Sequence, residues 1–80
     1  METFDVMLKT ADDVKKFVDI VSKYEFDVDL ISGRYVVDAK SILGIFSLDL
    51  DKPIQIEIYS EECEDLVGEL KPYILLKRKE

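Results

Sequence analysis

The chain has 80 residues, of which 48% are hydrophobic and 36% are charged, and its net charge is −7 at pH 7. This length suits one small domain over residues 1–80, and the balance of apolar and charged residues is typical of a globular chain rather than a disordered one. The negative charge argues against nucleic acid as a partner, because the phosphate backbone would be repelled.

The residue types also argue against several kinds of chemistry. The chain contains no histidine, and its three glycines lie far apart, so there is no glycine-rich phosphate loop. The absence of histidine removes the commonest general base and metal ligand, and Cys63 stands alone. We therefore expect neither an enzyme nor a bound metal or cofactor.

The same sequence predicts a cytoplasmic protein that does not enter a membrane. No apolar run reaches the roughly 18 residues that a membrane span needs, and no secretory leader is visible at the N-terminus. Cys63 cannot form an internal disulfide, which fits a reducing compartment.

The first two elements are a strand and a helix. Residues 2–8 alternate between apolar and polar side chains, which predicts a strand whose inner face carries Phe4, Val6 and Leu8. Thr10 then suits the N-cap of an amphipathic helix that has Asp12 and Asp13 in its first turn. The apolar stripe of this helix consists of Val14, Phe17, Val18 and Val21.

A hairpin follows the first helix. Residues 26–32 alternate again, and Gly33 in "SGR" separates them from a second strand pattern, "YVVDA". The side chains expected to face inward are Phe26, Val28 and Leu30 on the first strand, and Tyr35, Val37 and Ala39 on the second.

The second half begins with a short apolar segment at Ser41 and continues with a strand over residues 54–59. A final helix is expected to have Ser60 as its N-cap and an apolar stripe that ends at Leu70, and Pro72 should end or kink it. The basic "KRKE" of residues 77–80 is interpreted as a solvated tail at a helix C-terminus. The order β-α-β-β-α-β-α thus predicts an α+β open sandwich, in which a four-stranded antiparallel sheet carries the helices on one face.

With this order, the chain resembles HPr, the histidine-containing phosphocarrier protein of the bacterial phosphotransferase system. The resemblance rests on "SKYEFDVDL" (residues 22–30), on Gly33, on "VDAKSILGIFSL" (residues 37–48) and on "KPIQIEI" (residues 52–58). It covers essentially the whole chain and implies the HPr-like open-faced β-sandwich.

The carrier site of the family is not matched. In HPr, a histidine before the first helix takes phosphate from Enzyme I, and an arginine two residues later helps to hold it. These positions match Thr10 and Asp12, and the next family residue, a proline, matches Asp13. Two carboxylates would repel a phosphoryl group, and threonine cannot form a phosphoramidate. The sequence therefore predicts that carrier chemistry is lost, and that these residues only cap the helix.

A second family site is retained. The resemblance matches Ser41 to a serine that an ATP-dependent HPr kinase phosphorylates in many bacteria, and Lys40 precedes it. Phosphoserine at a helix N-terminus lies beside the positive end of the dipole. Serine is equally common there as an unmodified N-cap, so both interpretations stay open.

The apolar segment also has two interpretations. The resemblance matches Ile42, Leu43 and Phe46 to exposed side chains that contact partner proteins, and Ile45 and Leu48 to core positions. Lys40 is expected to belong to the same protein-binding surface. Burial of all five in a thin domain remains the alternative. An exposed patch of this kind usually marks an interface.

These observations lead to three hypotheses. The first is a regulatory or protein-binding domain that acts through residues 41–48, with an HPr-type kinase, a transcriptional regulator or a phosphotransferase-system component as partner. The second is an ordinary phosphocarrier for sugar transport. The third is a structural module that forms a homodimer through the Ile42, Leu43 and Phe46 patch, in contrast to a monomer that binds another protein.

Overall fold

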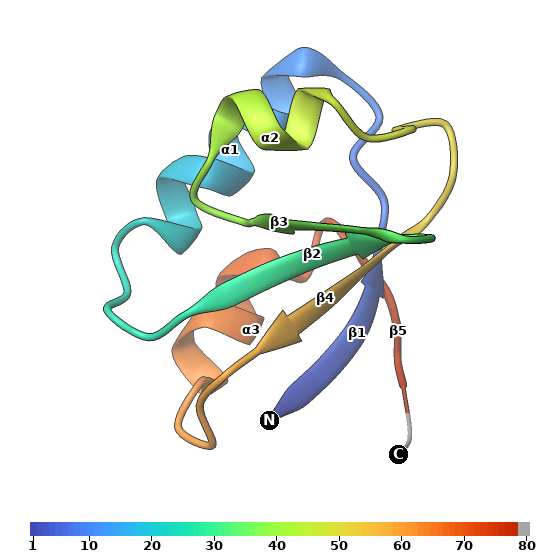
Figure 1. Cartoon of the computed structure of the whole chain (residues 1–80). Coiled ribbons are helices and arrows are strands. Elements are labelled where there is room, and N and C mark those ends of the chain that lie inside the picture. Colours follow the sequence, from blue (N-terminus) through green and yellow to red (C-terminus); the bar gives the residue numbers. More distant parts are fainter. Residues whose placement is uncertain (79–80) are drawn as a thin grey trace.

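A computed structural model gives the structure of the protein and describes residues 1–78 (Figure 1). The elements within these residues are β1 (Glu2–Val6), α1 (Ala11–Val21), β2 (Val28–Ser32), β3 (Tyr35–Asp38), α2 (Ile42–Phe46), β4 (Ile54–Ile58), α3 (Glu64–Leu70) and β5 (Ile74–Lys77). The strands form one antiparallel sheet in the order β3-β2-β4-β1-β5. The predicted α+β class and antiparallel sheet are confirmed.

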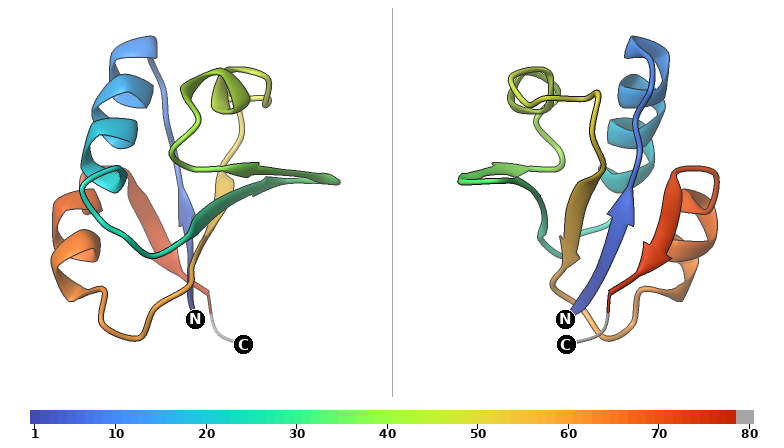
Figure 2. Two further views of the ribbon diagram at one scale, coloured as in Figure 1. Left: turned by 60° about the vertical axis from the view of Figure 1, so that its left-hand side comes forward. Right: turned by 90° about the vertical axis from the view of Figure 1, so that its right-hand side faces the viewer.

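The core lies between the sheet and the helices, which cover one face of it (Figure 2). Alternating residues of the central strands supply one side of this core, and the apolar stripes of the helices supply the other. The residues with no exposed side-chain surface include Val6, Leu8, Val14, Phe17, Val21, Leu30, Ala39, Ile45, Ile56, Ile58, Leu66 and Leu70. Most inward positions read from the sequence are therefore confirmed.

The predicted hairpin joins β2 to β3 through a two-residue turn. Ser32 pairs with Tyr35, which leaves Gly33 and Arg34 as the turn residues. Gly33 has a φ of 60°, and no other described residue has a positive φ. This pattern suits a type II′ turn, in which glycine occupies the first central position.

The sheet has five strands in the described residues, so the predicted count of four was too low. Pro72 does end the last helix, as expected, and α3 stops at Leu70. The chain then turns and adds β5 to the free edge of β1, where Phe4 pairs with Lys77. Lys77 therefore lies in a strand, where its ammonium pairs with Glu2 at 2.6 Å, rather than in a tail after a helix. Residues 79 and 80 of the predicted tail lie outside the described part.

The start of the last helix was also predicted wrongly. The N-cap position is Cys63, not Ser60, and its side chain makes no capping bond. The Ser60 hydroxyl instead accepts a bond from the Glu62 N–H at 3.1 Å, which forms a local turn that delays the helix. Cys63 is buried as expected, and this burial raises the pKa of its thiol.

Two predicted inward residues lie elsewhere. Tyr35 is 71% exposed, because the end of the hairpin extends beyond the layer of helices. Phe26 precedes β2 rather than belonging to it, and it is half-buried against the ring of Tyr24, with a centroid distance of 5.5 Å.

Candidate functional site

The two sequence-predicted sites lie at the starts of two neighbouring helices. Helices α1 and α2 contact each other, and α2 lies over the β3 side of the sheet (Figure 1). A hydrogen bond also connects the segments next to the two helices: the Lys40 ammonium donates to the Tyr24 carbonyl oxygen at 2.7 Å. This bond ties the residue before Ser41 to the chain just after α1.

Two capping hydrogen bonds order the start of α1. Thr10 is the N-cap, and its hydroxyl accepts a bond from the Asp13 N–H at 3.0 Å. The Asp13 carboxylate in turn accepts a bond from the Lys9 N–H at 3.1 Å. This reciprocal arrangement is close to a capping box, which satisfies donors that would otherwise be free at a helix start.

The second acidic residue of this turn is held by a lysine one turn later. Asp12 forms an ion pair with Lys16 at 3.0 Å, and this hydrogen-bonded contact raises the pKa of Lys16. Both side chains are largely exposed, so the pair contributes little to stability. Two carboxylates therefore occupy the positive end of the α1 dipole, where an incoming phosphate would be attracted in their absence.

The start of α2 uses the same capping device in a different setting. Ser41 is the N-cap, and its exposed hydroxyl accepts a bond from the Gly44 N–H at 3.2 Å. The first turn of α2 contains no acidic residue. Ser41 therefore caps α2, and its side chain remains exposed beside the cap.

Gly44 allows α2 to pack closely on β3. A Cβ at this position would lie 3.2 Å from the Ser41 Oγ and 3.3 Å from the Val37 Cβ. Such distances are shorter than ordinary van der Waals contact, so a side chain here would displace either the cap or the strand. This role could not be predicted from the sequence, because a glycine within a helix pattern indicates close packing only after its neighbours are known.

The apolar side chains of α2 divide into buried and exposed sets. Ile45 and Leu48 lie in the core, as predicted. Leu43 is 81% exposed and Phe46 is 43% exposed, so the alternative of full burial is wrong. Ile42 is half-buried against the core, and only part of it belongs to the surface.

Lys40, which is predicted to contact a partner, is only partly exposed at the surface of the protein. It is half-buried, its ammonium is engaged by Tyr24, and its backbone N–H donates to the Asp38 carboxylate at 2.8 Å. This lysine fixes the approach to α2. The sequence did not indicate the role of Tyr24, since the bond uses a backbone carbonyl that any residue could supply.

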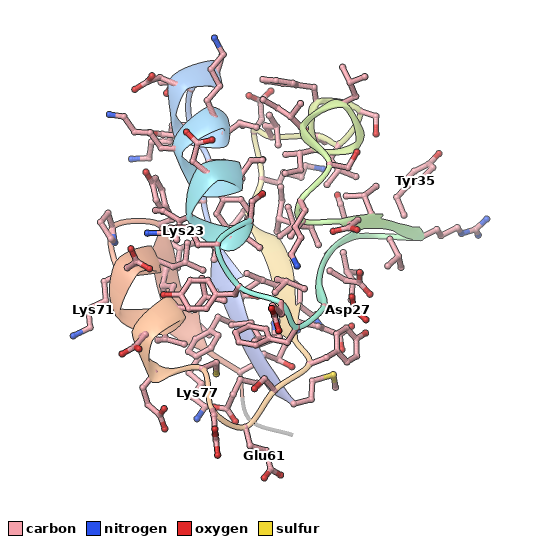
Figure 3. All side chains as sticks on the ribbon, turned by 90° about the vertical axis from the view of Figure 1, so that its left-hand side faces the viewer. Lys23, Asp27, Tyr35, Glu61, Lys71 and Lys77 are labelled. Atoms are coloured by element: carbon pink, nitrogen blue, oxygen red, sulfur yellow. The ribbon has the colours of Figure 1, made fainter. Side chains whose placement is uncertain are left out.

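The far end of α1 is joined to α3. Lys23 lies between the two helices (Figure 3) and forms an ion pair with Glu69 at 2.5 Å. The Tyr24 hydroxyl donates to the same carboxylate, which raises the pKa of Tyr24 to about 12 and, together with Lys23, lowers the pKa of Glu69. These contacts fix the end of α1 against α3.

The family model for the PTS HPr component phosphorylation site matches residues 10–74. This range contains both helix starts and most of the sheet. The chain belongs to the HPr family. Members of this family are phosphocarrier-type proteins of the phosphotransferase system rather than enzymes, and they work by contact with other proteins of that system.

A solved structure agrees with this membership at the level of fold. The chain is similar to the crystal structure of HPr-C-His from Thermoanaerobacter tengcongensis, with a TM-score of 0.75 and 23% sequence identity. The match covers 90% of this chain and 89% of that one, and it confirms the predicted HPr-like fold. A search of the curated proteins finds no match.

The described residues contain neither a group of metal-ligating side chains nor a membrane-spanning helix. Between residues 1 and 78, the His, Cys, Asp and Glu side chains form no group of three that could hold a metal ion. Over the same range, every helix is too short or too polar to cross a membrane.

Proposed function

We propose that this chain is a single HPr-like domain that has lost phosphocarrier activity and acts in the cytoplasm as a regulatory or protein-binding module. The binding surface, here called the α2 surface, consists of Ser41, Leu43, Phe46 and the exposed part of Ile42. The observation that carries this proposal is the exposure of Leu43 and Phe46 beside an accessible Ser41.

The chemistry of the α1 start supports the loss of carrier activity. The 80 residues contain no histidine, and the hydroxyl at the matching position, Thr10, is used to cap α1. A phosphothreonine ester lacks the high transfer potential of a phosphoramidate. Asp12 puts a negative charge where the family places a cation, and Asp13 adds a second carboxylate to the same turn, so this turn favours neither the arrival nor the retention of a phosphoryl group.

The packing of α2 supports its use as a binding surface. A helix of five residues has little stability of its own, and Ile45 and Leu48 hold it to the core from below. Leu43 and the exposed part of Phe46 are thus held at the surface on a rigid support. Exposed apolar side chains arranged in this way are typical of protein interfaces, in which aromatic residues often contribute most of the binding energy.

Phosphorylation of Ser41 is the proposed form of regulation. Its hydroxyl is exposed and bonded only to a backbone N–H at the start of α2, so a phosphate would remain near the positive end of that helix. Incubation with ATP and a bacterial HPr kinase, followed by peptide mass spectrometry, tests this step. We expect phosphate on Ser41, and its absence would reject regulation by this kinase while leaving the binding surface in place.

The binding surface itself is tested by substitution. Phe46→Asp should abolish capture of a partner, whether an HPr-type kinase, a transcriptional regulator or a phosphotransferase-system component. Leu75→Asp is the matched control, because Leu75 is also an exposed apolar residue but lies on β5. Equal capture by wild type and Phe46→Asp would refute the proposal. Light scattering on both variants separates binding to a partner from self-association through the same patch.

A further inference from the structure

The two edges of the sheet differ in how well they are protected from pairing with another strand. β3 and β5 are the edge strands. The β5 edge carries a register shift opposite Asp5 and Val6, and it ends in Lys77 and Arg78, both held in ion pairs. A bulge and edge cations are common devices against unwanted strand pairing.

The β3 edge has no bulge and no cation within the strand. Its sequence, Tyr-Val-Val-Asp, contains no proline or lysine, and its ladder with β2 is regular. Tyr35 is 71% exposed and Val36 is 60% exposed, although aromatic and β-branched residues are strong strand formers. Figure 2 shows the hairpin extending away from the body, and Figure 3 shows Tyr35 projecting from it.

The free backbone groups of this edge belong to Val36. The Ala39 N–H donates to the Val28 carbonyl at 2.9 Å, so Ala39 is turned toward β2. Because this direction alternates along a strand, the N–H and C=O of Val36 point away from β2. They form a place where another strand can add to the sheet.

The charges at the two ends of β3 identify the strand that fits. Arg34 precedes the strand, has no ion-pair partner among residues 1–78, and has a charge opposite to that of Asp38 at the other end. An antiparallel copy of the same segment, centred on Val36, sets Arg34 opposite Asp38 of the second copy. A parallel copy would instead bring each charge close to its own kind.

We propose that β3 pairs with β3 of a second copy of this chain, in antiparallel register with Val36 opposite Val36. In this register Tyr35 lies opposite Val37 of the second copy, on the helix side of the sheet. The interface is isologous, so each Arg34 to Asp38 contact occurs twice. Gly44 of α2 packs against Val37 of β3, whereas the proposed pairing uses the outer edge of β3.

Sedimentation equilibrium from micromolar to millimolar protein tests the pairing. We expect a reversible dimer, and we expect Val36→Lys to weaken it by about tenfold or more, because two ammonium groups then face each other. Leu75→Lys, on the other edge, should leave the dimer unchanged. A wild-type chain that is monomeric at every concentration would overturn the proposal, and so would a dimer that Val36→Lys leaves intact.

The register is tested by cross-linking. Opposed residues of a hydrogen-bonded pair have Cα atoms about 5.5 Å apart, within the range of a disulfide, so Val36→Cys should cross-link two copies on oxidation. Tyr35→Cys is the control, because Tyr35 of each copy lies about 8 Å from the other in this register. Cys63 is buried in both variants. Equal cross-linking by the two variants, or a dimer lost through Phe46→Asp, would contradict the β3 interface.

Discussion

The starts of α1 and α2 use the same cap and are surrounded by different side chains. Thr10 and Ser41 each accept a bond from the N–H three residues later, at 3.0 and 3.2 Å. The first turn of α1 has two carboxylates, whereas that of α2 has none and is followed by exposed apolar side chains. Because the caps are alike, we infer that the charges and apolar groups around a helix start, and not its cap, decide whether it can bind phosphate or a protein.

The largest effect is expected when the α1 start is given the histidine and the cation that it lacks. The double substitution Thr10→His and Asp12→Arg supplies a phosphate acceptor and replaces one carboxylate with a cation. Incubation with phosphoenolpyruvate and a bacterial Enzyme I should then label the variant, whereas wild type stays unlabelled. Asp12→Arg alone is the control and should not be labelled. A double variant without label would show that more than these two residues separates the chain from a carrier.

The support of the α2 surface is expected to show the next largest effect. Ile45→Ala removes a fully buried side chain beneath α2 and should lower the free energy of unfolding by about 2–5 kcal/mol. Leu43→Ala, on the exposed side of the same helix, should change it by less than about 0.5 kcal/mol. Urea denaturation measures both. Similar losses for the two variants would mean that Leu43 is packed rather than presented.

The two caps should show a smaller and similar effect. Thr10→Ala and Ser41→Ala should each lower the free energy of unfolding by about 1 kcal/mol, because each leaves a helix N–H without its bond. Ser41→Asp keeps an oxygen at the cap and should stay within about 0.5 kcal/mol of wild type. Urea denaturation again provides the comparison, and a neutral Ser41→Ala would show that its cap contributes nothing.

The smallest effect concerns the junction of α1 with α3. The bond to Glu69 raises the pKa of Tyr24 to about 12, from an ordinary value near 10. Since the folded-state pKa is raised, its contribution to stability is complete below pH 10 and is lost as the pH rises toward 12. Ultraviolet titration should show Tyr24 ionising after an ordinary tyrosine, and Glu69→Gln should move it back toward 10. Coincident ionisation of all tyrosines in wild type would contradict the bond.

Much of the fold could be predicted from the sequence, because its signals are local. Alternation placed Phe4 and Val6 inward, the stripe of α1 followed the helical period, and Gly33 marked the hairpin. The errors arose where tertiary contacts decide. The segment after Pro72 became β5 because β1 offered a free edge, and Tyr35 became exposed because the hairpin extends beyond the helices.

The candidate site could be predicted in outline only. The sequence located both helix starts and distinguished the buried Ile45 from Leu43 and Phe46 through the family resemblance. It could not show that the Lys40 ammonium is bonded to the Tyr24 carbonyl, since that bond joins positions sixteen residues apart. The close approach of Gly44 to Val37 was likewise set by packing, which no local pattern records.

We propose that the α1 start no longer accepts phosphate. The most direct measurement is the intact mass of the wild-type protein after incubation with phosphoenolpyruvate and Enzyme I, with a histidine-containing HPr as positive control. The account predicts that the control gains a phosphoryl group and this chain does not. A phosphoryl group on any residue of this chain that can be passed on to a sugar permease component would contradict it.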